Sequence, residues 1–325
     1  MSSLLSQTYT DIPNALTKLV AWAVSEGWTD KSGDIAAGTQ LYKQIGGLDC
    51  YFNFQTFTTK TDPFPHVFEY DDVKGIAVIG STGTSGNDWI NQPGFTPWAF
   101  DTYTTTPYGG CIDDLISGGG ECHFFSTDTT IAAIFKTESV VEDWRGVVFG
   151  TVGGKQFYWA SGGRTAYTHP TSYGGYDTRS NMFGGDGYYA TAGVRTDLRN
   201  ACALFEDTYW VTCNGGAQQY GMWGVIAGSS PTESEADRRN MKGSVSSVLV
   251  ELSPDKLRGN TILCPVEITC SRDVGGLVIP VGELEGVRVL NMKYLYNEVE
   301  ITYATDTYKC FKMSNYKDQG IGFLV

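Results

Sequence analysis

The sequence is poor in histidine, in charged side chains and in long apolar runs. Its 325 residues include 3 His, and Asp, Glu, Lys and Arg together make up 18%. No stretch approaches the roughly 20 consecutive apolar residues that a membrane-spanning helix needs, so we expect no membrane insertion. The opening residues, MSSLLSQ, contain neither the basic nor the apolar segment of a secretory signal. We therefore expect synthesis and folding in a cytoplasm.

Basic residues are also scarce relative to acidic ones. The chain has 23 Lys and Arg against 36 Asp and Glu, which gives a net charge of −13. A surface of this sign repels the phosphates of nucleic acids and of anionic membranes. Nucleic acid is therefore not expected as a partner.

The sequence patterns of common catalytic and cofactor sites are missing. There is no GxSxG nucleophile elbow and no Walker loop, and no helix pattern that would bind phosphate follows the glycine-rich residues 80–86. His66, His123 and His169 lie in three unrelated contexts, whereas a zinc site needs clustered ligands. We expect no metal, no cofactor and no enzymatic activity.

The eight cysteines are scattered, and no pair has CxxC spacing. Cys202 and Cys213 flank a possible hairpin and could become cross-strand neighbours. A chain of this size does not need disulfides to fold, and a cytoplasm keeps thiols reduced. We therefore favour buried, reduced cysteines that act as small hydrophobic residues.

Glycine and aromatic side chains are abundant. There are 40 Gly, and Phe, Trp and Tyr make up 13% of the chain. Glycine permits tight turns, and aromatic residues favour pleated surfaces. We predict a mainly β fold of antiparallel sandwich-like or barrel-like domains, with one N-terminal amphipathic helix.

That helix is predicted near the start of the chain. Thr10 or Asp11 can cap it, Pro13 suits its first turn, and Gly27 ends it. Because Lys18 is its only cation, we expect it to pack against a sheet rather than lie on a membrane. Its apolar residues recur at helical spacing at Leu16, Leu19, Val20, Ala23 and Val24.

Short apolar runs punctuated by Gly, Pro, Asn and Asp follow from residue 42 onward, which is typical of closely spaced strands. Two runs separated by Thr127 and Asp128 predict a hairpin, and the last run, IGFLV, predicts that the C-terminus is tied into a sheet. We divide the chain into domains 1–165 and 166–325. The main predicted strands are residues 49–58, 74–79, 121–126, 129–137, 146–152, 247–252, 260–269, 276–281, 287–290, 298–303, 308–312 and 320–325.

Residues 161–193 contain almost no aliphatic side chain and many Gly, Tyr and Thr. Long segments of this kind in compact proteins are commonly functional or interfacial. Tyrosine gives a large contact area with a polar tip. We predict an interface at Tyr173, Tyr176, Tyr188 and Tyr189, with a loop packed on its own body as the equally weighted alternative.

The order of motifs resembles that of a family of tailed-bacteriophage virion structural proteins. The N-terminal half contains Gly27-Trp28, the aromatic run YFNF (51–54), the turn GSTG (80–83) and QPG (92–94), and a hairpin begins at HFFSTD (123–128). The C-terminal half matches best, with LCPV (263–266) followed by the most specific motif, GELEGV (282–287). The resemblance implies a tail, neck or baseplate component that is present in multiple copies.

Three functions are therefore compared. The first is a non-enzymatic virion protein that is made in the host cytoplasm and binds other virion proteins and itself. The second is an adhesion module that binds a host-surface glycan through Trp and Tyr. The third, a glycan-degrading enzyme, needs two carboxylates across a cleft, and no pair in the sequence indicates one.

Overall fold

The computed structural model describes the backbone of a discontinuous set of residues. The described residues are 2–57, 74–95, 110–113, 115–137, 144–160, 164–165, 178–181, 184–185, 201–205, 209–212, 261–272, 277–292, 294–312 and 319–325. They form a mainly β structure with one α-helix near the N-terminus, as the sequence predicts. No helix among them is long and apolar enough to cross a bilayer.

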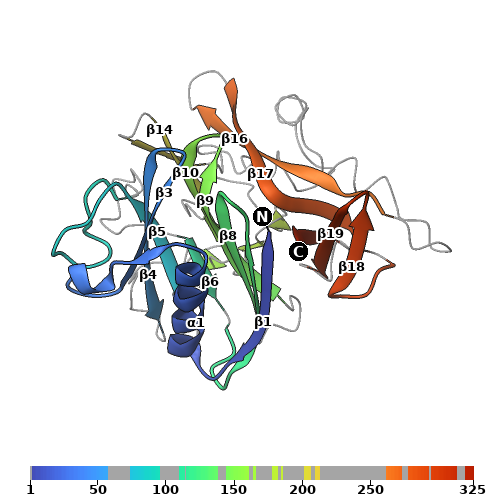
Figure 1. The fold of residues 1–325 in the computed structure, drawn as a ribbon, viewed down its shortest axis with the longest axis horizontal. Coiled ribbons are helices and arrows are strands. Elements are labelled where there is room, and N and C mark those ends of the chain that lie inside the picture. Colours follow the sequence, from blue (N-terminus) through green and yellow to red (C-terminus); the bar gives the residue numbers. More distant parts are fainter. Residues whose placement is uncertain are drawn as a thin grey trace, which may run out of the picture.

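Three antiparallel sheets account for most of the strands (Figure 1). The N-terminal sheet contains, in order, β2 (Thr29–Asp30), β3 (Thr39–Ile45), β4 (Leu48–Phe57), β5 (Gly75–Ser81) and β6 (Gly110–Asp113). The central sheet contains β1 (Ser3–Tyr9), β7 (Gly120–Ser126), β8 (Thr130–Lys136), β9 (Trp144–Val152), β10 (Lys155–Ala160), β14 (Ala201–Phe205) and β15 (Tyr209–Thr212). The C-terminal sheet contains β16 (Cys264–Arg272), β17 (Leu277–Asn291), β20 (Gln319–Leu324), β19 (Asp306–Lys312) and β18 (Val299–Tyr303). A small ribbon is formed by β11 (Arg164–Thr165), β12 (Thr178–Asn181) and β13 (Gly184–Gly185).

The central sheet is covered on both faces, so the fold is a sandwich of three layers. On one face Phe149 of β9 packs against Phe52 and Phe54 of the N-terminal sheet, with ring centroids 5.2 and 5.3 Å away. On the other face Phe125 of β7 stacks on Phe323 of the C-terminal sheet at 4.6 Å. Because both faces are covered, β8 and β9 are buried almost throughout and read as continuous apolar runs instead of alternating ones.

The helix α1 (Ile12–Ser25) packs on the first of these two cores, as expected. The Asp11 side chain caps it by accepting a hydrogen bond from the Asn14 backbone N–H at 2.7 Å. Leu19 and Ala23 of this helix are fully buried on the side that faces the core. The chain then turns at Gly27, whose φ of 85° suits glycine, and the turn places Trp28 in the same core.

Several predicted strands are confirmed. The hairpin β7–β8 forms, and the strand pair β14–β15 places Cys202 opposite Thr212. The C-terminal strand β20 lies between β17 and β19, and the Val325 N–H donates to the Thr307 carbonyl at 2.9 Å. The chain end is thus part of a sheet interior. The predicted strand 247–252 lies outside the described residues.

Other strands differ from the prediction. Residues 276–281 and 287–290 were expected to form two strands but belong to one long strand, β17, whose pairing with β16 shifts register before Glu267 and after Ile268. These irregularities allow the strand to continue past Gly282 where the apolar pattern is interrupted. The strands β1, β3 and β10 were not predicted at their observed positions.

The predicted division at residue 165 crosses the central sheet. The strand β10 precedes the boundary and β14 follows it, yet they pair with Phe157 opposite Ala203. The second core likewise joins Trp144 and Phe157 to residues of the C-terminal sheet. The two predicted halves therefore share one sheet and one core.

Candidate functional site

The four tyrosines predicted as an interface, Tyr173, Tyr176, Tyr188 and Tyr189, lie outside the described residues. The structure instead identifies three features that position polar or exposed groups. They are a polar cluster between the central and C-terminal sheets, a glycine contact that joins these sheets, and the outer edge of β18.

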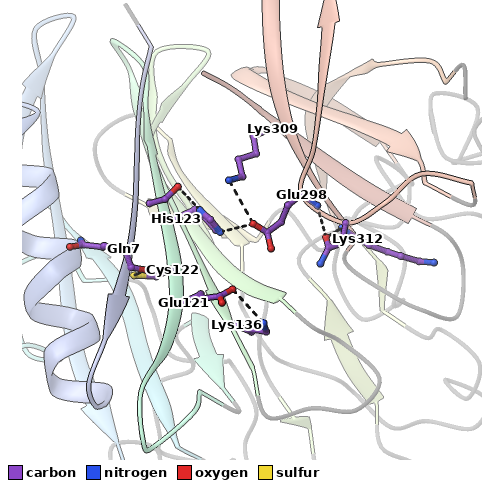
Figure 2. Close-up of polar contacts among 10 residues, drawn as sticks. Gln7, Glu121, Cys122, His123, Lys136, Glu298, Lys309 and Lys312 are labelled. Atoms are coloured by element: carbon purple, nitrogen blue, oxygen red, sulfur yellow. Dashed lines mark hydrogen bonds and ion pairs between the residues drawn. The ribbon is translucent and has the colours of Figure 1, made fainter.

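The polar cluster is centred on His123 of β7 (Figure 2). Ser6 of β1 lies directly opposite His123 in the sheet, and its Oγ is 2.8 Å from the ring Nδ1. On the other side of the ring, Oε2 of Glu298 lies 3.4 Å from Nε2 and 3.7 Å from Nζ of Lys309. The contact with Glu298 is long, and Nε2 makes no well-aligned hydrogen bond within the described part of the chain. The cluster therefore connects β1 and β7 to the C-terminal sheet.

Aromatic rings hold His123 in place. Trp144 and Phe311 each lie 5.0 Å from its ring centroid, and the residue is 5% exposed. Burial, together with the positive charge of Lys309, lowers the pKa of His123 from 6.5 to about 4. The imidazole is therefore neutral at pH 7. In the tautomer that carries the proton on Nε2, facing Glu298, Nδ1 accepts the hydroxyl hydrogen of Ser6.

Glu298 adopts an unusual backbone conformation that aims its carboxylate at this cluster. Its φ is 61°, in the left-handed region that non-glycine residues rarely enter. The Asn297 side chain stabilises the turn, because its Oδ1 accepts hydrogen bonds from the N–H groups of Glu298 at 3.1 Å and Lys312 at 2.8 Å. Such conformations persist only where neighbouring contacts impose them.

The order Ser6, His123, Glu298 resembles the nucleophile, base and acid of serine hydrolases. A general base suited to neutral pH has a pKa near 7, and the pKa of His123 lies far below that value. The ring is also enclosed by Trp144 and Phe311. The geometry thus suits a partly buried polar connection between sheets better than proton transfer from Ser6.

No group of three or more His, Cys, Asp or Glu side chains in the described ranges is placed to hold a metal ion. His123 and Cys122 point to opposite faces of the sheet, as expected for neighbours in a strand, since Cys122 belongs to the first core. Burial raises the pKa of Cys50, Cys122 and Cys310 to about 12. These three thiols are buried and reduced, in line with the sequence interpretation.

The second feature is the position of the GELEGV motif. Its first glycine, Gly282 of β17, packs against Gly153 in the turn between β9 and β10. A Cβ on Gly153 would lie 1.8 Å from the Val281 carbonyl oxygen, and a Cβ on Gly282 would lie 2.7 Å from the Gly153 nitrogen. Further along the motif, the Thr129 hydroxyl donates to the Glu285 carboxylate. The motif thus fastens the C-terminal sheet to two turns of the central sheet.

The third feature is the outer edge of the C-terminal sheet at β18 (Figure 1). Among the described strands, β18 pairs with β19 alone, with Thr302 opposite Thr307. The Thr307 carbonyl points toward β20, where it accepts a hydrogen bond from the Val325 N–H. Thr302 and Thr307 therefore form a non-hydrogen-bonded pair, in which the backbone groups of the two residues point away from each other. By the same alternation, the N–H and C=O groups of Glu300 and Thr302 point outward from the sheet. Both residues are exposed.

Exposed tyrosines adjoin this edge. Tyr303 ends β18 with 72% of its surface exposed, and Tyr296 in the preceding segment is 87% exposed. Between Tyr294 and Tyr296, Leu295 packs in a small apolar cluster with Val299 and Ile301 of β18. By the alternation of a strand, Tyr303 lies on the same face as the apolar side chains of β18, and Tyr296 lies in the segment that leads into the strand.

No protein-family model matches the chain, and no curated protein matches its sequence.

The sequence does not reveal these features, because each depends on contacts between residues that are distant in the chain. Ser6 and His123 are 117 residues apart, and Glu298 follows much later, so no local motif links them. The GELEGV motif was noticed, but its role as a fastening between sheets depends on Gly153, which no spacing rule connects to it. A partial signal for the edge existed in the tyrosines flanking the predicted strand 298–303.

Proposed function

We propose that this chain is a non-enzymatic structural component of a bacteriophage virion, in the tail, neck or baseplate, present in multiple copies. The observation that carries the proposal is the open edge of β18 with Tyr296 and Tyr303 beside it. An edge strand with unpaired backbone groups is a template for pairing with another chain. Tyrosine is enriched at protein interfaces because its ring supplies apolar area and its hydroxyl remains hydrated.

The structural role of GELEGV supports the same function. The motif carries the strongest resemblance to virion proteins, and in this fold it joins two sheets. A motif that joins two sheets in this way maintains the architecture of the fold. The acidic composition, with a net charge of −13, also favours a protein partner over nucleic acid.

The test is the composition of purified phage particles from cells that produce this chain. We expect quantitative mass spectrometry to find it in the particle at several copies, and cryo-electron microscopy to place it outside the capsid interior. Its absence from particles purified to constant composition would contradict the proposal.

A host-surface glycan is the second candidate partner, because exposed tyrosine rings can stack on sugar rings. The 87% exposure of Tyr296 favours it as the stacking side chain. A glycan array probed with the native oligomer tests this function, with Tyr296→Ala as the matched variant. Binding that is absent, or that the substitution leaves unchanged, would remove this role from Tyr296.

A further inference from the structure

The outer edge of β18 can be matched to one partner from its own residues. Glu300 and Thr302 present outward-facing N–H and C=O groups, and Val299, Ile301 and Tyr303 alternate with them along the strand. Resting on the proposed multicopy assembly, we propose that β18 pairs antiparallel with β18 of a second copy, about a two-fold axis at Ile301.

The backbone geometry limits the possible registers. A two-fold antiparallel pair forms hydrogen bonds between residues whose backbone groups point outward. With the axis at Ile301, Glu300 of each copy pairs with Thr302 of the other, and about four inter-chain hydrogen bonds form. Every outward-facing backbone group of these two residues is then used.

The side chains favour this register over the two alternatives, in which the two-fold axis lies at Glu300 or at Thr302. An axis at Glu300 would place two carboxylates directly opposite each other, which is destabilising. An axis at Thr302 would place Glu300 opposite Ala304, which lies beyond the end of β18 and has a φ of 55°. The axis at Ile301 places Tyr303 opposite Val299, an aromatic and β-branched pair of the kind that stabilises sheets.

The apolar cluster under the edge would become continuous across the two copies. Val299 and Ile301 are only partly buried and pack on the cluster that contains Leu290, Tyr308 and Cys310. A second β18 in this register brings another Ile301 and Tyr303 against the same face. The symmetric contact extends an existing core, and this complementarity favours a second copy over an unrelated chain.

The contact is small. A five-residue edge and its flanking tyrosines bury less than the about 800 Å² per partner of a standard interface. We therefore expect a reversible dimer with a dissociation constant on the order of 10–100 µM. Glu300 and its symmetry mate are diagonal neighbours in the pair, at roughly 7–8 Å, so their repulsion weakens it.

The first experiment compares Thr302→Pro with Thr302→Ala in the full chain. The Thr302 N–H makes no ladder bond to β19, so proline at this edge removes the outward backbone donor without breaking the ladder and is tolerated by the sheet. Both substitutions remove the hydrogen bond between the Thr302 and Thr307 hydroxyls, so Thr302→Ala controls for that loss. We expect sedimentation velocity up to about 1 mM to show a reversible dimer for the natural chain and for Thr302→Ala. We expect Thr302→Pro to be a monomer whose thermal unfolding matches that of Thr302→Ala, and an unchanged dimer for Thr302→Pro would overturn the proposal.

The second experiment reads the register and does not depend on the proline variant folding. A pair opposite itself brings Cα atoms to about 4.5 Å, within disulfide range, so Ile301→Cys should cross-link to itself under mild oxidation. Tyr303→Cys lies opposite Val299 and should not, and the natural chain controls for its own cysteines. Glu300→Gln should tighten association about 2–5-fold, because it removes the diagonal repulsion.

The outcomes separate this pairing from the proposed function. A chain that is found in particles but stays monomeric at about 1 mM, with no Ile301→Cys cross-link, overturns the self-pairing and leaves the virion role standing. A chain that dimerises in this register but is absent from particles supports the pairing and contradicts the virion role. Equal cross-linking by Tyr303→Cys overturns the register and the two-fold axis at Ile301.

Discussion

His123 shows how one buried side chain makes the stability of this protein depend on pH. Its pKa is about 4 in the folded chain and about 6.5 when exposed. Between these values the unfolded state binds more protons than the folded state. The stability that the neutral His123 contributes is therefore fully present above pH 6.5 and falls as the pH is lowered toward 4. Below pH 4 this group causes no further loss of stability.

We expect His123→Phe to remove this part of the pH dependence. Phenylalanine fills the space between Trp144 and Phe311 but cannot titrate. The free energy of unfolding is measured with denaturant at pH 7 and at pH 4.5. Between pH 7 and pH 4.5, the natural chain should lose on the order of 2 kcal/mol more of this free energy than the variant, allowing for water near Glu298 and Lys309. The charges that face the ring, Glu298 and Lys309, are unchanged in the variant. An equal loss in both proteins would show that His123 is not held neutral.

Gly153 and Gly154 offer a comparison of two adjacent glycines that differ in one respect. Both have positive φ, at 56° and 71°, so alanine at either costs about 1 kcal/mol in backbone strain. A Cβ on Gly153 would lie 1.8 Å from the Val281 carbonyl oxygen, whereas one on Gly154 meets nothing within 4 Å.

We therefore expect Gly153→Ala to lower the free energy of unfolding by about 3 kcal/mol more than Gly154→Ala does, because the two sheets must move apart. Chemical denaturation of the two variants measures the difference. Similar losses would mean that the contact between Gly153 and GELEGV is not tight.

At the scale of elements, the helix α1 was the most predictable part of the fold. Its cap, its apolar spacing and its terminal glycine all lie within a short stretch of sequence, and the observed helix agrees with each. The cap gives a direct prediction, since the Asp11 carboxylate accepts from the Asn14 N–H. Asp11→Ala should destabilise the protein by about 1 kcal/mol, while Asp11→Asn, which keeps an acceptor, should cost only a few tenths. Thermal unfolding measures both, and equal effects would contradict a capping role.

Strands were less predictable, because their partners are distant in the sequence. The strand β1 escaped prediction because it is a half-exposed edge with Ser6, Gln7 and Thr8 in succession, and only its pairing with β7 defines it. The reverse error occurred in β17, where Gly282 and Gly286 interrupt the apolar pattern while the strand continues. The local pattern of apolar and polar residues indicates which face of a strand is buried, but it does not indicate the register of the strand or the position of a bulge.

The candidate site was less predictable still, because it depends on the packing of layers. Ser6, His123 and Glu298 come from three separate elements, and only the stacking of the C-terminal sheet on β7 brings them together. The open edge of β18 follows from the strand order in the sheet, which no local pattern encodes. The predicted tyrosine interface at residues 161–193 stays a prediction.

For the molecule as a whole, the main consequence is that the central sheet belongs to both cores. One core joins it to the N-terminal sheet and α1, and the other joins it to the C-terminal sheet. If the chain is divided at residue 165, β14 and β15 are separated from β10, and the face of Phe125, Trp144 and Trp159 is uncovered. A fragment of residues 1–165 would therefore expose a large apolar surface, which soluble monomers rarely do.

We expect the halves 1–165 and 166–325 to behave as complementary fragments and not as independent domains. Expressed separately, fragment 1–165 should aggregate or bind a hydrophobic dye, and co-expressed fragments should copurify as a complex that unfolds in one transition. Trp144→Ala removes a side chain of the shared core and should weaken the complex, whereas Tyr296→Ala, at an exposed position outside that core, should not. The contrary outcome is that each half unfolds cooperatively, stays monomeric and does not bind the other. This result would show that the C-terminal sheet is stabilised by its own contacts and that the second core adds little to its stability.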